Sequence, residues 1–131
     1  MRAWGDGHGE LAVEGGVRVP LEIASSYRAR TRGLLGRTRV EGALLLTPAA
    51  SVHTFRMRFP LDIAYLDRHL RVIALHTVPP NRLTAPRLRA RHVLEAGAGA
   101  MAGWGMRPGV HVRVRVHPDG GRAQPGGSDE R

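Results

Sequence analysis

Apolar and polar residues alternate with a period of two over several short stretches of this chain, which is the pattern of half-buried β-strands. The clearest alternation covers residues 110–116, and two more strands, at residues 11–14 and 17–23, are joined by Gly15 and Gly16 as in a two-residue hairpin. Pro20 cannot donate a hydrogen bond to a sheet ladder. We therefore expect the second strand to lie at an edge or to be paired on one side at Pro20.

Continuous apolar runs predict strands in the interior of the sheet. Residues 43–46 fit a fully buried strand, residues 63–66 and 72–75 fit a hairpin, and residues 91–95 fit a further strand. One helix is predicted over residues 26–35, with Ser25 or Ser26 as N-cap and Gly36 as its end, and a second over residues 98–104. Residues 76–89 contain three prolines, which predict a loop long enough to cover a cleft.

These elements predict a mainly β protein with α+β elements, either an antiparallel β sandwich or a partly open barrel with one or two short helices. The length of 131 residues suits one domain, which we place at residues 1–117, and we find no internal repeat or second domain. Residues 118–131 consist mainly of glycine, proline, serine and charged residues, so we expect a disordered tail there.

The composition excludes several kinds of chemistry. The chain has no cysteine, which rules out disulfides, thiolate zinc sites and a cysteine nucleophile. Its first residues contain no apolar signal segment, and no run approaches the roughly 18 apolar residues of a membrane span. We therefore expect a cytoplasmic protein that does not contact membranes.

The net charge of +9 raises the question of nucleic-acid binding. All 20 basic residues are arginines, and alanine, glycine, proline, valine and leucine are abundant, which is the composition that GC-rich codons give to any protein. Aromatic and basic residues do not alternate as they do in single-strand binders. The densest basic patch, which is either a solvated helix face or a weak nucleic-acid site, consists of Arg28, Arg30, Arg32, Arg37 and Arg39.

The segment with the most unusual chemistry is residues 51–62, where ionisable side chains stand among apolar ones. His53 is either a metal ligand or general base, or a ring that satisfies a turn carbonyl. Asp62 precedes a core strand and must be neutralised, with Arg58 as the nearest partner, or serve as an orienting carboxylate. Glu95, which ends an apolar run, presents the same alternatives.

Five motifs, taken in their order along the chain, resemble the family called domain of unknown function 192. They are Arg-Gly-Leu-Leu-Gly-Arg (32–37), His-Thr-Phe-Arg-Met-Arg-Phe-Pro-Leu-Asp (53–62), Tyr-Leu-Asp (65–67), Val-Leu-Glu-Ala-Gly (93–97) and Gly-Met-Arg-Pro-Gly (105–109). The resemblance covers residues 11–116 and implies a compact β sandwich or partly open barrel with no established activity. The chain departs from the family pattern at Leu70, where a glycine commonly ends the turn, and at Arg56, where many members have tryptophan.

Three functions remain open from the sequence. The first is a non-enzymatic binding or accessory domain that takes a small anionic ligand or a protein segment. Its cleft would be formed by His53, Arg58, Asp62 and Glu95 and covered by residues 76–89, which we call the proline loop. Arg58 would bind the acid group of the ligand. The second is a metal-dependent hydrolase or metal-binding protein that uses His53, Asp62 and Glu95. The third is a non-specific nucleic-acid binder. We favour the first, and we predict no cofactor because residues 96–100 lack the lysine of a phosphate-binding loop.

Overall fold

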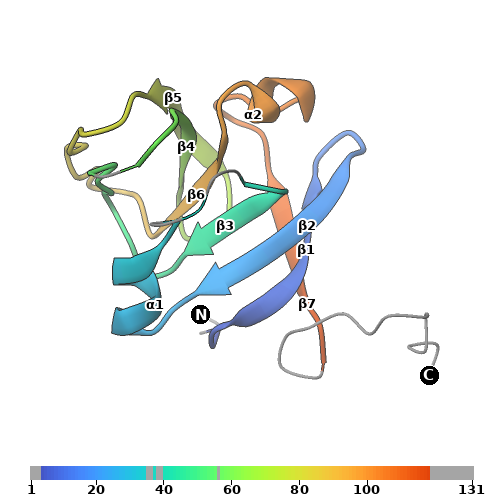
Figure 1. Ribbon diagram of the computed structural model, residues 1–131. Coiled ribbons are helices and arrows are strands. Elements are labelled where there is room, and N and C mark those ends of the chain that lie inside the picture. The colour runs from blue at the N-terminus through green and yellow to red at the C-terminus, as the bar shows by residue number, and fades with distance from the viewer. Residues whose placement is uncertain (1–3, 35–36, 38–39, 56, 119–131) are drawn as a thin grey trace.

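The computed structural model describes residues 4–34, 37, 40–55 and 57–118. Within them, seven strands form one sheet in the order β5-β4-β6-β3-β2-β1-β7, accompanied by two short helices (Figure 1). The strands are β1 (Gly7–Val13), β2 (Arg18–Ala24), β3 (Ala43–Leu46), β4 (Leu61–Leu66), β5 (Val72–Val78), β6 (His92–Gly97) and β7 (Val112–Val116). The helices are α1 (Tyr27–Arg32) and α2 (Ala100–Gly103).

The mainly β class with two short helices is confirmed, but the sheet is mixed rather than wholly antiparallel. The pair β2–β3 is parallel, because the chain returns from β2 through α1 in a crossover connection, and the other pairs are antiparallel. The sheet curls without closing into a barrel. Its edge strands β5 and β7 meet only at one end, where an isolated bridge joins Arg71 to His111.

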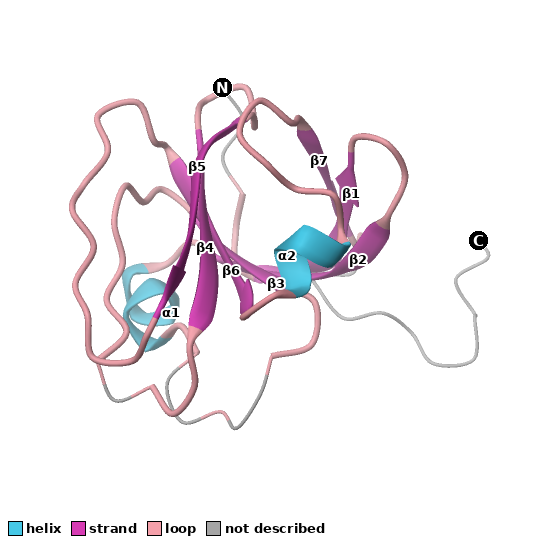
Figure 2. Cartoon of the chain, turned by 90° about the horizontal axis from the view of Figure 1, so that it is seen from above, coloured by secondary structure: helices cyan, strands magenta, loops and turns pink. Residues whose placement is uncertain are grey.

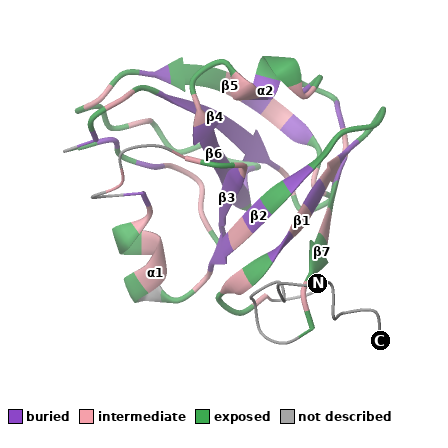
Figure 3. Ribbon diagram, turned by 45° about the vertical axis from the view of Figure 1, so that its right-hand side comes forward, coloured by how far each residue is buried: buried purple, intermediate pink, exposed green. Residues whose placement is uncertain are grey.

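The sheet is buried on both faces along β3, β4 and β6, whereas β1, β2 and β7 are buried mainly on the concave side. Side chains from all seven strands fill the concave side, which we call the inner face and which includes Met101 of α2. The convex side, or outer face, is covered by α1 and by residues 48–59. Seen from above, α2 lies within the curve and α1 outside it (Figure 2). Every residue of β3 and β4 is buried (Figure 3), so neighbouring side chains on these strands enter different cores.

Local sequence signals account for the ends of most elements. The predicted hairpin pairs Leu11 with Val19, and Pro20 faces Glu10 of β1 while the pairing with β3 begins one residue later. Ser26 caps α1 as predicted, accepting a hydrogen bond from the backbone N–H of Ala29 at 3.1 Å. The helix ends at Arg32 with Gly33, not the predicted Gly36, as its C-cap. Residues 33–34 of the predicted helix form a turn, and residues 35–36 lie outside the described residues.

Two other expectations concern the C-terminal tail and membrane-spanning segments. The predicted tail falls almost wholly on residues 119–131, which lie outside the described residues. Neither described helix is long and apolar enough to cross a membrane.

Candidate functional site

A cavity of about 380 Å³ lies on the outer face, between α1, the segment 48–57 and the sheet; we call it the outer cavity. Its floor comes from three neighbouring strands, β3, β6 and β4, through Leu46, Glu95 and Leu61. Its volume falls in the range of small-molecule pockets. Its polar lining residues are Arg30, Thr31, Arg32, Ser51, His53 and Glu95.

Glu95 is the charged group at the floor of this cavity. It lies on β6 opposite Leu44 and Ile63 of the neighbouring strands, and its side chain is only 4% exposed. Its carboxylate accepts no hydrogen bond from any other described residue. Burial raises the pKa of Glu95 to about 7, and the positive charge of Arg37 opposes this rise. Glu95 therefore changes its protonation state near neutral pH.

Arg37 does not neutralise Glu95, because it is already engaged by another carboxylate. Its two terminal nitrogens lie 2.9 Å from the two carboxylate oxygens of Glu22 on β2. Glu22 and Glu95 stand on either side of Leu44 in one row across the sheet. A bidentate pair of this kind holds the guanidinium in place. The charge of Arg37 therefore acts on Glu95 by electrostatic attraction and not by a direct hydrogen bond.

Helix α1 forms one wall of the cavity and is tied to the opposite wall by Arg30. The Nε of Arg30 donates to the carbonyl of Ser25 at 3.1 Å, and its Nη1 donates to the carbonyl of Pro48 at 3.2 Å. Gly33, which ends the helix, passes so close to the floor that a Cβ atom there would stand 4.0 Å from Oε1 of Glu95. Arg30 is thus part of the frame, whereas Arg32 is exposed beside the opening.

The second wall, residues 48–53, is held by the proline loop. Thr54 is fully buried, and its hydroxyl donates to the carbonyl of Pro79 at 2.7 Å and accepts from the backbone N–H of Arg82 at 2.9 Å. Thr84 likewise exchanges hydrogen bonds with the backbone of Val52. The predicted cover is therefore wrong in detail, because residues 76–89 contribute nothing to the cavity lining and support the wall from behind.

The structure brings His53 and Glu95 to the same cavity but separates them from the other two candidates. His53 is exposed at the lining, with its ring stacked on Phe55 at 5.1 Å between centroids. Arg58 is exposed and is not among the lining residues, so its predicted contact with a bound acid group has no support here. Whether His53 and Glu95 bind a ligand stays a prediction.

Asp62 lies on the inner face, opposite to Glu95, and its partners are structural. Its Oδ1 accepts from the hydroxyl of Thr77 at 2.7 Å, and its Oδ2 accepts from the backbone N–H of Met101 in α2 at 3.0 Å. The expected pairing with Arg58 is not found among the described contacts. The three-ligand metal site of His53, Asp62 and Glu95 is not assembled, and no other metal-binding group of His, Asp or Glu occurs within the described residues.

The arginines of the predicted basic patch have separate roles. Arg30 holds backbone carbonyls and Arg37 pairs with Glu22, whereas Arg28 and Arg32 are exposed on α1. Arg39 lies outside the described residues. Sequence reasoning did not select the hydroxyl-bearing lining residues, Thr31 and Ser51, as binding candidates. No local pattern marks Ser51, because the path of residues 48–54 over the sheet is set by contacts with residues distant in the chain.

Comparison with known proteins relates this chain to a family of sequences. The sequence model of domain of unknown function 192, described as "Uncharacterized ACR", matches residues 10–114. A UPF0127 protein of Pyrococcus horikoshii is 33% identical over 94 residues, which cover 68% of this chain and 78% of that protein. Another, from Thermococcus kodakarensis, is 32% identical over 60% of this chain and 54% of its own length.

Two solved structures share the fold. A protein of unknown function from Novosphingobium aromaticivorans superposes with a TM-score of 0.70 at 24% identity, covering 81% of this chain and 84% of that one. A candidate transcription regulator from Sinorhizobium meliloti superposes with a TM-score of 0.71 at 19% identity, covering 87% and 97%. At these identities the likeness concerns the fold alone.

Proposed function

We propose, for a chain that belongs to the family called domain of unknown function 192, that it is a binding domain whose outer cavity takes a small polar molecule. One end of the ligand carries a hydrogen-bond donor, such as an amine or hydroxyl, that meets Glu95. The other end carries a carboxylate or phosphate that meets Arg32 at the opening.

The observation that carries the proposal is the buried carboxylate of Glu95 at the floor of a cavity. A carboxyl group that is 4% exposed is costly to ionise, and none of the hydrogen bonds among the described residues is made to Glu95. A donor group on a ligand would remove that cost on binding. Perturbed carboxyls in clefts are common at functional sites for this reason.

The charge at the opening supports an acid group at the other end of the ligand. Arg32 is exposed and forms no ion pair with the other described residues, so its planar guanidinium is free to bind a carboxylate or phosphate in a bidentate manner. In this proposal Arg32 takes the part first expected of Arg58. The volume of about 380 Å³ favours a small molecule over a protein segment.

The two other functions have less support. A metal-dependent hydrolase would need a third ligand beside His53 and Glu95, and Asp62 lies on the opposite face with both oxygens engaged. A nucleic-acid site on α1 would have to use Arg28 and Arg32, since Arg30 and Arg37 are held by protein groups. The description of the Sinorhizobium meliloti protein as a candidate transcription regulator applies to that protein and adds only a shared fold.

The test is a thermal-shift panel of amino acids, hydroxy acids and phosphorylated hydroxy compounds at about 150 mM salt, where weak surface attraction is screened. A ligand present at about 100 times its Kd adds about 2.7 kcal/mol, which raises the Tm of a chain of this length by roughly 9 °C. The proposal predicts a shift in the wild type that Glu95→Gln abolishes and that Glu10→Gln, which removes a half-exposed carboxylate of β1, retains.

A second matched pair tests the other end of the ligand. Arg28 and Arg32 are both exposed on α1, but only Arg32 lines the cavity. Arg32→Gln is expected to weaken the ligand at least fivefold, whereas Arg28→Gln is expected to leave its Kd within a factor of about two. An unresponsive wild type, or a shift that survives in Glu95→Gln, would overturn the proposal.

A further inference from the structure

A second and larger cavity, of about 620 Å³, lies on the inner face, where β7 meets the turn between β4 and β5; we call it the inner cavity. It is separated from the outer cavity by the sheet itself, because its β6 residue, His92, points to the opposite face from Glu95. Its lining residues are Trp4, Arg68, His69, Leu70, His92, His111, Val112, Arg113 and Val114.

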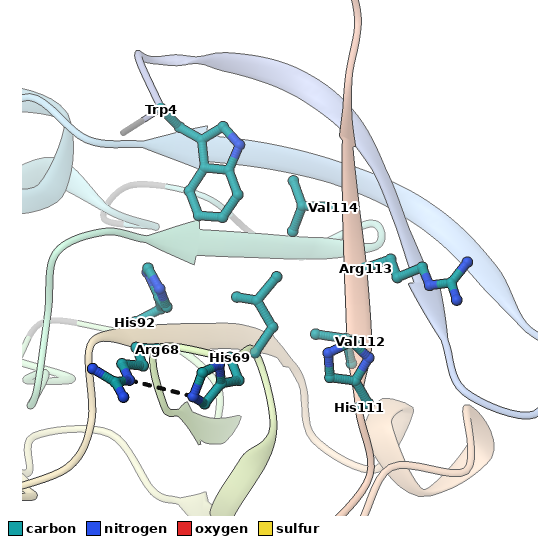
Figure 4. A pocket seen from close by; sticks show the side chains of 9 residues that line it. Trp4, Arg68, His69, His92, His111, Val112, Arg113 and Val114 are labelled. Carbon is teal, nitrogen blue, oxygen red and sulfur yellow. Dashed lines mark hydrogen bonds between the residues drawn. The ribbon is translucent and has the colours of Figure 1, made fainter. Parts of the chain in front are cut away.

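The body of the inner cavity is aromatic and aliphatic. The rings of Trp4 and His92 pack edge to face with centroids 5.5 Å apart, and Val114 lies beside them (Figure 4). Leu70 completes the apolar lining. The Nε1 of Trp4 is buried and has no hydrogen-bond acceptor among the described residues. The indole therefore contributes to the cavity wall through its apolar ring.

His92 contributes a neutral ring to this wall. Its Nδ1 lies 2.7 Å from the hydroxyl of Thr47, an interaction buried beneath the cavity. Burial, together with the charge of Arg91, lowers the pKa of His92, and the charge of Asp67 opposes this. The ring is therefore uncharged at neutral pH, and because it is only 4% exposed it forms the back of the apolar wall behind Trp4.

The charged groups at the opening are all basic, since the cavity lining contains no carboxylate. The Nε of Arg68 donates to Nε2 of His69 at 3.3 Å, which leaves its terminal nitrogens available, and Arg68 is exposed without an ion pair to another described residue. Arg113 points away from Trp4 and His92 (Figure 4). Arg68 is thus the guanidinium best placed to meet an anion.

The backbone at the opening is held in an unfavourable conformation. Leu70 has a φ of 65°, in the left-handed region that favours glycine, and its side chain packs against the inner core. The turn is fixed by Asp67, whose carboxylate accepts the backbone N–H groups of His69 and Arg71 at 2.8 and 3.0 Å. Strain of this kind is often found where a side chain is positioned for a ligand.

From this arrangement we infer that the inner cavity is a second binding site, for a small planar apolar molecule with one acid group. The ring system of such a molecule would pack between Trp4, His92 and Leu70, and its carboxylate would bind the terminal nitrogens of Arg68. This site is independent of the outer cavity and of the function proposed for it.

The test uses 2-naphthoate as the probe and its uncharged counterpart 2-naphthamide as the control. Binding is followed by NMR through the indole N–H resonance of Trp4, which Trp104→Phe distinguishes from the other tryptophan. Naphthoate is expected to shift the Trp4 resonance with a Kd of about 1 mM or tighter. The amide, which lacks the charge, is expected to bind about tenfold more weakly.

Three substitutions tie the binding to this cavity. Arg68→Gln is expected to weaken naphthoate about tenfold, whereas Arg89→Gln, an exposed arginine on the proline loop, is expected to change it less than about twofold. Leu70→Gly removes part of the wall, suits the backbone conformation and is expected to weaken binding in a folded protein. The inference is overturned if the Trp4 resonance does not respond, if Arg68→Gln has no effect, or if Glu95→Gln removes the binding.

Discussion

The buried carboxylate of Glu95 makes a quantitative prediction about how stability depends on pH. Its pKa is raised by burial from the usual 4.5 to about 7, so the folded protein binds a proton that the unfolded chain has already released. The free energy of unfolding must then fall as the pH rises through this interval. The full cost of ionising Glu95 in the folded state is about 3 kcal/mol, reached above pH 7.

Replacing Glu95 with Gln keeps the shape of the side chain and removes the titration. Between pH 5 and pH 8 the stability of Glu95→Gln relative to the wild type is expected to increase by about 2 to 3 kcal/mol, or roughly 10 °C in Tm for a chain of this length. The assay is urea unfolding of both proteins across this pH range. Taking the difference removes the contributions of the histidines, which both proteins share.

Glu10→Gln serves as the control, because it removes a carboxylate from a strand position where the side chain is 38% exposed and so far less buried than Glu95. Its stability relative to the wild type should change little between pH 5 and pH 8. A difference between Glu95→Gln and the wild type that stays flat with pH, or that falls as the pH rises, would refute the reasoning. The carboxylate would then be satisfied in the folded protein, and the case for a ligand at the outer cavity would lose its main support.

Three further predictions concern the frame around the two cavities. Asp62→Asn replaces one of two hydrogen-bonded carboxylate oxygens with an amide nitrogen, so the free energy of unfolding in urea should fall by about 1–3 kcal/mol. Ligand binding at the outer cavity should not change. A loss of binding with unchanged stability would contradict this prediction. Thr54→Val leaves the carbonyl of Pro79 and the backbone N–H of Arg82 unpaired, so the free energy of unfolding should fall by about 2 kcal/mol. Proteolysis within residues 79–90 should also become faster. Equal cleavage rates in the variant and the wild type would count against this. Gly42→Ala should destabilise the protein strongly, because φ is 74° and the added Cβ would collide with a backbone carbonyl of β2. Gly97→Ala, where the added Cβ would meet open space, is the control. Equal melting temperatures of the two variants would disprove the clash.

The sequence allowed most of the strands to be predicted because their signals are local. The alternation at residues 110–116 and the Gly15-Gly16 turn correspond to β7 and to the β1–β2 hairpin, and Ser26 caps α1. The pairing of β2 with β3 was not predicted. β2 and β3 are joined by a crossover connection, and the residue pattern within each strand does not indicate whether its neighbour runs parallel or antiparallel.

The candidate site was predicted only in part, for a physical reason that Asp62 and Glu95 illustrate. Both lie in strands that are buried on both faces, so their neighbours are apolar on either side and the alternation that normally distinguishes two faces is missing. Only the register, which sets Ile63 rather than Asp62 opposite Glu95, shows that the two carboxylates point in opposite directions. Register depends on pairing across the sheet, which the sequence does not state.

The cavity walls were beyond sequence reasoning for a related reason. The proline loop was expected to cover a cleft, but hydrogen bonds to the fully buried Thr54 hold it behind the wall of the outer cavity. The inner cavity was not anticipated at all. Trp4, Leu70 and His92 are far apart in the chain and are brought together only by the curl of the sheet.

The most direct test of the account is to titrate the side-chain carboxyl of Glu95 by carbon NMR, in the wild-type protein with and without a molecule selected by the thermal-shift panel. Without the ligand, the midpoint is expected at about 7. With saturating ligand, the midpoint should fall, because a donor beside the carboxylate stabilises its ionised form. A midpoint near the usual value of 4.5 in the free protein, or one that the ligand leaves unchanged, would contradict the assignment of the outer cavity as the binding site.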